Sequence, residues 1–344
     1  MSQTPNAAPD GFFLDSYAGL NSMKIRALSI AFATCLIAAG CGQKTPPAPA
    51  AVPAKPTASP AVVAPRAPVP PQAEAREATV KSLASDHSKI RYRVYGKGEP
   101  TLVLIHGWSC DSGYWDSQLN ELAQTYTLIT LDLAGHGKSD VKKRKDWSMA
   151  NFGADVAAVV NAVGQPRVIL VGHSMGGPVA LEAARQLQGK VIGIVGVDTL
   201  RQIAAPYPKE QTEPLLAAMH QDFAKATADF VANNFFTDQT DPIVKKWIIK
   251  DMSSAPRKVA IPALEALLAM DYRKAVADLD VPIVAINADP PPTDEAAIRR
   301  VEPRFRVVPV PGVGHFLMME KPDFFNTALR RIADRWASLE PRAQ

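Results

Sequence analysis

Six short runs of apolar and β-branched residues constrain the fold of this chain more than any other feature. Each run has five to seven residues, and segments of helical pattern separate most of them. The runs are Thr101–Ile105, Thr127–Leu131, Arg167–Val171, Val191–Val197, Val281–Ile286 and Phe305–Val310. Such runs are typical of strands buried on both faces, and their alternation with helices predicts an α/β fold with a mostly parallel sheet flanked by helices.

Two segments ahead of the first run alternate between apolar and polar residues. Val80–Ala84 and Lys89–Tyr95 flank a turn at Asp86-His87-Ser88. This pattern predicts a pair of antiparallel edge strands. We therefore expect one folded domain that spans residues 76–344.

The alternation of strands and helices is interrupted between residues 197 and 281. More than eighty residues there have mostly helical character, including Glu213–Ala232 and Pro242–Met252. We interpret residues 200 to about 276 as an inserted helical cap. Its aromatic side chains are candidates either for an apolar substrate pocket or for core packing: Phe223, Phe230, Phe235, Phe236 and Trp247.

The segment 23–40 has the parts of a secretory signal: a basic start at Met-Lys-Ile-Arg, a short apolar stretch and small residues. The apolar stretch is shorter than the roughly 20 residues that a membrane-spanning helix needs. Its end, Ala38-Ala39-Gly40-Cys41, resembles a bacterial lipoprotein box, which implies cleavage before Cys41 and acylation of that cysteine. An ordinary signal peptide, cut nearby, is the alternative.

Residues 41–75 predict an extended linker, because ten of the thirty prolines lie between Pro46 and Pro71. Residues 1–22 fit no targeting pattern, and we expect them to be a non-native extension ahead of a start at Met23. The expected location is the periplasmic side of a bacterial membrane, anchored by lipid. Gly42, which follows the cysteine, favours the outer membrane over the inner one.

Composition excludes several classes of protein. The net charge is only +4, and the one basic run, residues 142–145, lies between Asp140 and Asp146. We interpret this run as a solvated loop, so no nucleic-acid partner is expected. The six histidines are dispersed, and neither H-E-x-x-H nor paired C-x-x-C occurs, so no metal or other cofactor is expected.

A nucleophile motif follows the third of the six apolar runs. The sequence from Val168 to Gly177 is a buried strand, then Gly172-His-Ser174-Met-Gly176, then the start of a helix. A G-x-S-x-G turn in this setting raises the serine hydroxyl above the sheet edge. Ser174 is therefore the predicted nucleophile.

An acyl-transferring serine needs backbone N–H donors for the oxyanion of its tetrahedral intermediate. One donor belongs to the residue after the nucleophile, Met175. The other belongs to the loop after the first run, which reads His106-Gly107-Trp108. The predicted oxyanion hole is thus formed by the amides of Trp108 and Met175, with His106 as a structural loop residue.

Four motifs in order resemble the α/β-hydrolase superfamily, in its capped esterase, haloperoxidase-like and C–C-hydrolase branches. The resemblance covers roughly residues 90–340. The motifs are His106-Gly107, Asp132-Leu-Ala-Gly135-His136-Gly137-Lys-Ser139, Gly172-His-Ser-Met-Gly-Gly177 and Gly314-His315-Phe316. The resemblance implies an α/β-hydrolase fold, and a serine nucleophile argues against the dehalogenases and epoxide hydrolases of this superfamily, which use aspartate.

The base and the acid follow from chain order, which in this fold is serine, acid, histidine. His315 comes after the last run in a flexible loop and is the predicted base. The resemblance implies an acid just after the penultimate strand, so Asp289 is the preferred acid, although the family's usual glycine-x-x-aspartate pattern is absent there. Asp198, at the end of the run before the cap, and Asp294, expected in a first helical turn, are the alternatives.

These residues predict hydrolysis of an ester-like small molecule through an acyl-enzyme on Ser174. A C–C-bond hydrolase, a lactonase, a thioesterase and a cofactor-free haloperoxidase would use a similar triad. A ligand-binding or sensing module is the alternative outside the enzymes. The sequence defines neither the substrate nor the oligomeric state.

Overall fold

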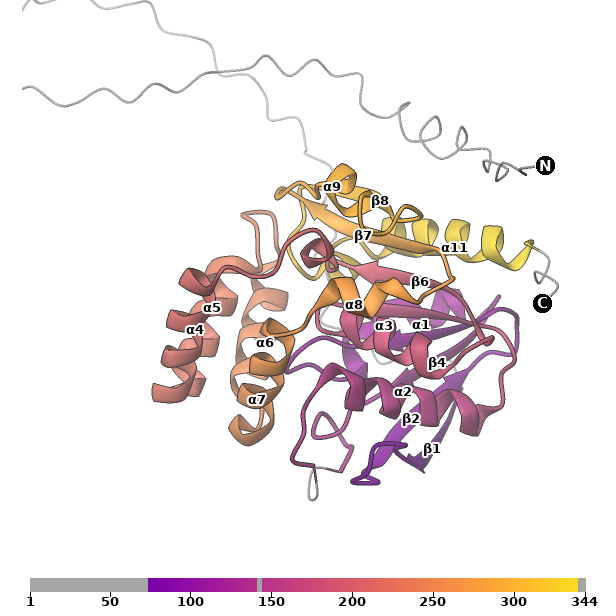
Figure 1. The fold of residues 1–344 in the computed structure, drawn as a ribbon, viewed down its shortest axis with the longest axis horizontal. Coiled ribbons are helices and arrows are strands. Elements are labelled where there is room, and N and C mark those ends of the chain that lie inside the picture. Colours follow the sequence, from indigo (N-terminus) through magenta and orange to yellow (C-terminus); the bar gives the residue numbers. More distant parts are fainter. Residues whose placement is uncertain (1–73, 141–143, 340–344) are drawn as a thin grey trace, which may run out of the picture. The chain divides into compact units, whose positions relative to one another are not determined.

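The computed structural model describes residues 74–140 and 144–339, which contain an eight-stranded sheet (Figure 1). Its order is β1-β2-β4-β3-β5-β6-β7-β8. β2 pairs antiparallel with both β1 and β4, and all other neighbouring strands are parallel. The strands are β1 (Ala75–Lys81), β2 (Lys89–Tyr95), β3 (Thr101–Ile105), β4 (Thr127–Leu131), β5 (Val168–His173), β6 (Val191–Val197), β7 (Ile283–Asp289) and β8 (Arg306–Pro311). The predicted α/β fold is confirmed.

The first edge strand differs from the prediction. β1 ends at Lys81, so the predicted strand Val80–Ala84 is wrong for most of its length. The chain leaves the sheet at Ser82, whose amide donates to the Ser88 carbonyl and closes the turn at 2.8 Å. Most residues of β1 are exposed, and this explains why an apolar alternation did not reveal it.

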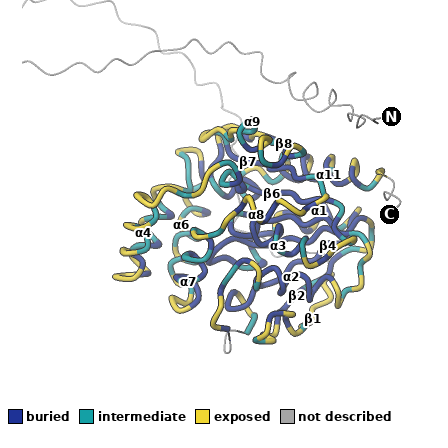
Figure 2. The backbone as a smooth tube through the Cα atoms, viewed as in Figure 1, coloured by how far each residue is buried: buried dark blue, intermediate teal, exposed yellow. Residues whose placement is uncertain are grey.

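Helices cover both faces of the sheet (Figure 1). α2 and α3 lie against each other on one face, and α1 and α11 lie together on the other. The buried residues gather in the strands and in the helix faces turned toward them (Figure 2). The helices outside the insertion are η2 (Ser112–Trp115), α1 (Asp116–Leu122), α2 (Met149–Val163), α3 (Gly176–Gln186), α9 (Glu295–Arg299), α10 (Leu317–Glu320) and α11 (Pro322–Ala337).

A helical region is inserted between β6 and β7, as the sequence predicts. It contains η3 (Arg201–Ile203), α4 (Lys209–Gln221), α5 (Phe223–Asn234), α6 (Pro242–Ser253), α7 (Arg257–Leu268) and α8 (Tyr272–Ala277). The single helix expected over Glu213–Ala232 is instead two helices. Asp222 separates them, because its extended backbone (φ −143°) ends α4 and its side chain accepts the Lys225 amide as the N-cap of α5.

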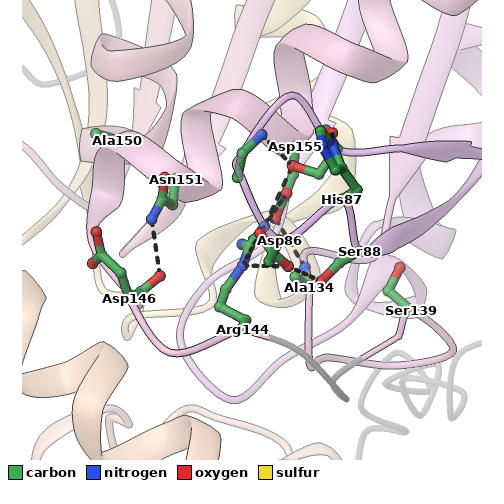
Figure 3. Close-up of polar contacts among 12 residues, drawn as sticks. Asp86, His87, Ser88, Ala134, Ser139, Arg144, Asp146, Ala150, Asn151 and Asp155 are labelled. Atoms are coloured by element: carbon green, nitrogen blue, oxygen red, sulfur yellow. Dashed lines mark hydrogen bonds and ion pairs between the residues drawn. The ribbon is translucent and has the colours of Figure 1, made fainter.

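The basic run also differs from its prediction, in that Arg144 is buried. Its Nη2 lies 2.7 Å from Asp155 Oδ1 on α2 and 3.1 Å from Asp86 Oδ1 in the β1–β2 turn (Figure 3). The Arg144 side chain is only 1% exposed. A buried carboxylate such as Asp155 requires a paired cation, so Arg144 is a structural contact, and the solvated-loop interpretation is wrong for this residue.

Several sequence predictions lie outside the described residues. These are the extension 1–22, the signal 23–40, the acylation site Cys41 and the linker 41–75 up to residue 73. Among the helices of residues 74–140 and 144–339, none combines the length and the apolar character needed to cross a membrane.

Candidate active site

Ser174 occupies the turn between β5 and α3. Its φ of 51° is left-handed, a conformation that costs a non-glycine residue about 1–3 kcal/mol. A side chain on Gly172 would overlap the carbonyl oxygen of Gly176, so the strand and helix approach each other closely only because residue 172 is glycine. The sharp turn leaves Ser174 partly exposed while both neighbouring residues are buried.

His315 lies in the loop between β8 and α10, beside the Ser174 turn. His173, the residue before Ser174, donates from Nε2 to the carbonyl oxygen of His315 at 3.0 Å, and the two rings are 4.7 Å apart. Burial lowers the pKa of His173 to about 3, so its ring is neutral at physiological pH. A buried, uncharged neighbour of Ser174 thus holds the backbone of His315.

Asp198 is the carboxylate that binds His315. Its Oδ2 lies 2.6 Å from His315 Nδ1, and its Oδ1 accepts the Ala288 amide at 2.9 Å. The preference for Asp289 as the contact of His315 is therefore wrong. Val197 of β6 pairs with Ile286 of β7. Asp198 is the first residue after this pair on its strand, whereas Asp289 is the third residue after it on the neighbouring strand.

The other acid considered from the sequence caps a helix. Asp294 is the N-cap of α9, where its Oδ1 accepts the Ala297 amide at 2.8 Å. A carboxylate at a helix N-terminus is stabilised by the helix dipole and by the free amides there. Asp294 therefore has a local structural role at the start of α9.

Asp198 is held ionised by its surroundings. Burial alone would raise its pKa, but the His315 hydrogen bond, the charges of His315 and Arg201 and the Ala288 amide outweigh burial and lower the pKa to about 2. Arg201 Nη2 lies 3.0 Å from Asp198 Oδ1. The ionised Asp198 accepts a hydrogen bond from His315 Nδ1–H, and this tautomer leaves Nε2 as the atom that can accept a proton.

The predicted oxyanion loop lies against the serine turn. A side chain on Gly107 would come within 3.2 Å of Ser174 Cβ, so the loop after β3 touches Ser174. Trp108 and Met175 directly follow these two residues in the sequence. Within residues 74–140 and 144–339, neither amide donates a hydrogen bond to another protein group, as an oxyanion hole requires.

His106 stabilises the predicted oxyanion loop through two hydrogen bonds. Its Nδ1–H donates to the Gly107 carbonyl at 2.8 Å, and its Nε2 accepts the Leu133 amide at 3.0 Å. The ring is fully buried, and burial lowers its pKa. His106 therefore links the loops after β3 and β4, which agrees with the structural role expected for it.

The inserted helices also contact this loop, through Trp108. The indole Nε1–H of Trp108 donates to the Ala260 carbonyl on α7 at 2.7 Å. A cavity of about 180 Å³ lies between this loop and helices α6 and α7, and Ser109, Cys110, Asp111, His136, Asp251 and Ala260 are among its lining residues. Asp251 accepts the Tyr114 hydroxyl at 2.8 Å, and burial raises the pKa of Asp251.

Comparison with known proteins agrees with this geometry. Residues 102–328 match the Alpha/beta hydrolase family. The chain belongs to the α/β hydrolase family. It is 28% identical to a non-heme haloperoxidase of Rhodococcus erythropolis over 267 residues, which are 72% of this chain and 96% of that protein. It is 30% identical to the pimeloyl-[acyl-carrier protein] methyl ester esterase of Methylococcus capsulatus over 199 residues, 56% of this chain and 76% of the esterase.

Solved structures of the family have the same fold. A thermophilic esterase from Thermogutta terrifontis superposes with a TM-score of 0.67 at 24% identity, covering 76% of this chain and 99% of the esterase. At this level of identity the likeness concerns the fold. The activity of this α/β hydrolase therefore has to be argued from its own site.

Sequence reasoning missed three polar residues around the site of this α/β hydrolase. Arg201 contacts the candidate acid, Asp251 lines the cap cavity, and Glu320 contacts the His315 loop through the Gly314 amide. Arg201 and Glu320 lie three and five residues from Asp198 and His315 in the sequence. That short spacing was an available signal, whereas Asp251 reaches the core only through the placement of the cap.

Proposed function

We propose that this protein is a serine hydrolase that cleaves ester bonds through an acyl-enzyme on Ser174. The observation that carries the proposal is the 2.6 Å contact between Asp198 and His315 on the loop beside the Ser174 turn. A carboxylate that binds an imidazole beside a partly exposed serine is the arrangement that activates a serine as a nucleophile.

Acylation uses each of these groups in turn. His315 Nε2 accepts the proton of Ser174 as the hydroxyl oxygen attacks the ester carbonyl, and Asp198 stabilises the imidazolium that forms. The amides of Trp108 and Met175 bind the oxyanion. When the tetrahedral intermediate collapses, the bond to the alcohol oxygen breaks and His315 returns the proton to the leaving alcohol.

Deacylation repeats these steps with water. His315 removes a proton from a water molecule, which attacks the acyl carbonyl, and the oxyanion again rests on the two amides. Collapse releases the carboxylic acid and returns the proton to Ser174. No other reactant is required.

The relatives support an ester as the substrate class. The Methylococcus relative is a methyl ester esterase, and the Thermogutta protein is an esterase. The rival activities to assay beside ester hydrolysis are cleavage of lactones, thioesters and C–C bonds, and peroxide-dependent halogenation.

The test combines turnover with active-site labelling. Purified protein should hydrolyse p-nitrophenyl acetate and butyrate, and a fluorophosphonate probe should modify the peptide that contains Ser174. Ser174→Ala should lose both signals, whereas Ser253→Ala on α6 should retain them. Equal turnover by the Ser174→Ala protein would contradict the proposal, and ligand binding without any turnover would favour the binding module.

We propose in addition that the mature protein is anchored by lipid at Cys41. Support comes from the Ala38-Ala39-Gly40-Cys41 box behind a basic and apolar segment. In a bacterial host, radiolabelled palmitate should enter the wild type but not Cys41→Ser, and the variant should leave the membrane fraction. Label in both proteins would contradict acylation at Cys41.

A further inference from the structure

The inserted helices contact the His315 loop at Phe235, the C-cap residue of α5. Its carbonyl oxygen accepts the His315 amide at 2.8 Å. Its ring centroid lies 4.3 Å from that of the imidazole, with 34° between the planes. Phe235 thus contacts both the backbone and the side chain of the candidate base.

Gly314 makes this contact possible. A side chain at this position would overlap the Phe235 carbonyl oxygen and would come within 2.9 Å of Glu320 Oε1. The backbone of the His315 loop therefore lies directly on the end of α5.

Glu320, on α10, forms a second link between the same two segments. Its Oε1 accepts the Gly314 amide at 3.0 Å, and its Oε2 accepts the hydroxyl of Thr240 at 2.8 Å. Thr240 lies in the connection from α5 to α6, and it is 7% exposed. A hydrogen bond to an ionised carboxylate is about twice as strong as one between neutral groups. One carboxylate therefore joins the loop before the base to the inserted helices.

Ring contacts continue from this point on both sides. Phe230 of α5 lies 5.1 Å from Phe235, and Phe316, the residue after His315, lies 5.9 Å from Phe235, both measured between ring centroids. Aromatic pairs at such distances stabilise each other beyond the area that they bury. The end of α5 is thereby packed against His315 and its neighbour.

We propose that Phe235 and the Glu320–Thr240 link position His315, so that the base is correctly placed only while the inserted helices are docked on the core. The inference rests on the proposed function, in which His315 is the base. Phe235, Thr240 and Glu320 are positioning residues here, since they act through His315. Docking of the insertion and assembly of the triad are then one event.

The test compares Phe235→Leu with Phe230→Leu, a matched variant that loses a ring of the same helix without a contact to the imidazole. Misplacement of a reacting group by about 1 Å costs on the order of 100-fold. Phe235→Leu should therefore lower kcat for p-nitrophenyl butyrate by about 10- to 100-fold with little change in KM. The rate constant of fluorophosphonate labelling should fall in parallel. Phe230→Leu should change kcat by less than about threefold. Phe235→Tyr, which keeps the aromatic ring, should have a kcat close to that of the wild type.

Thr240→Val and Glu320→Gln test the second link without removing a ring. Each should lower kcat, and the double variant should be no slower than the slower single variant, because both changes break one connection. Thermal unfolding of every variant checks that the protein is folded, and Thr240→Val, which is nearly isosteric, replaces any variant that is not.

Two results would overturn the positioning role while leaving the esterase intact. One is equal labelling rates for the wild type and the folded Phe235→Leu and Thr240→Val variants. The other is a Phe235→Leu effect confined to KM, which would make this ring a wall of the substrate pocket. Failure of the wild type itself to be labelled at Ser174 would instead refute the proposed function.

Discussion

Replacing Asp198 by asparagine tests the triad assignment most directly. The carboxylate accepts three hydrogen bonds, from the Ala288 amide and Arg201 at Oδ1 and from His315 at Oδ2. An asparagine whose oxygen keeps the first two contacts must turn its NH₂ group toward His315 Nδ1. The imidazole would then carry its proton on Nε2, the atom that has to accept the serine proton.

The wrong tautomer in a Ser-His-Asp site lowers kcat by about 10⁴, which corresponds to about 5.5 kcal/mol in the activation barrier. We expect this loss for Asp198→Asn in p-nitrophenyl butyrate hydrolysis. Circular dichroism and thermal unfolding should show a folded protein, since two of the three contacts are kept.

Asp289→Asn is the matched control at the neighbouring strand end. Its carboxylate is partly exposed and does not contact His315, so we expect kcat within about twofold of the wild type. A loss of about 10⁴ in Asp289→Asn together with a nearly active Asp198→Asn would refute the assignment of the acid. It would mean that the loop after β7 rearranges to bring Asp289 to the imidazole during turnover.

Two further predictions concern stability. Burial lowers the pKa of His136 and His173 to about 3, so the unfolded chain binds their protons more readily. The free energy of unfolding that the two neutral histidines contribute is fully present above about pH 6.5 and is lost as the pH falls toward 3, by up to about 1.4 kcal/mol per pH unit for each histidine. Urea unfolding at pH 7, 6, 5 and 4 measures this loss. A free energy of unfolding that stays constant over this range would contradict the prediction. Arg144→Met leaves Asp155 buried without its cation and should cost about 3–5 kcal/mol, whereas Arg185→Met, at a more exposed pair, should cost less than about 1 kcal/mol. Equal urea midpoints for these two variants would show that the Arg144 pair adds no stability.

The sequence determined the six parallel strands β3 to β8, the inserted helical region and the loops that contain Ser174 and His315. These features are local: a buried strand, a glycine-flanked turn and a helix start leave a pattern that can be read within ten residues. The order of the motifs along the chain then limited the base to the loop after β8.

Tertiary structure decided which aspartate contacts His315, the role of Arg144 and the contacts of Phe235. Two neighbouring strands, β6 and β7, each bring an aspartate to the same edge, and only their register and the left-handed turn at Asp198 select between them. Arg144 and Phe235 meet partners that are 11 to 80 residues away in the sequence. Such contacts depend on how whole elements dock, and a single sequence contains no local signal for that geometry.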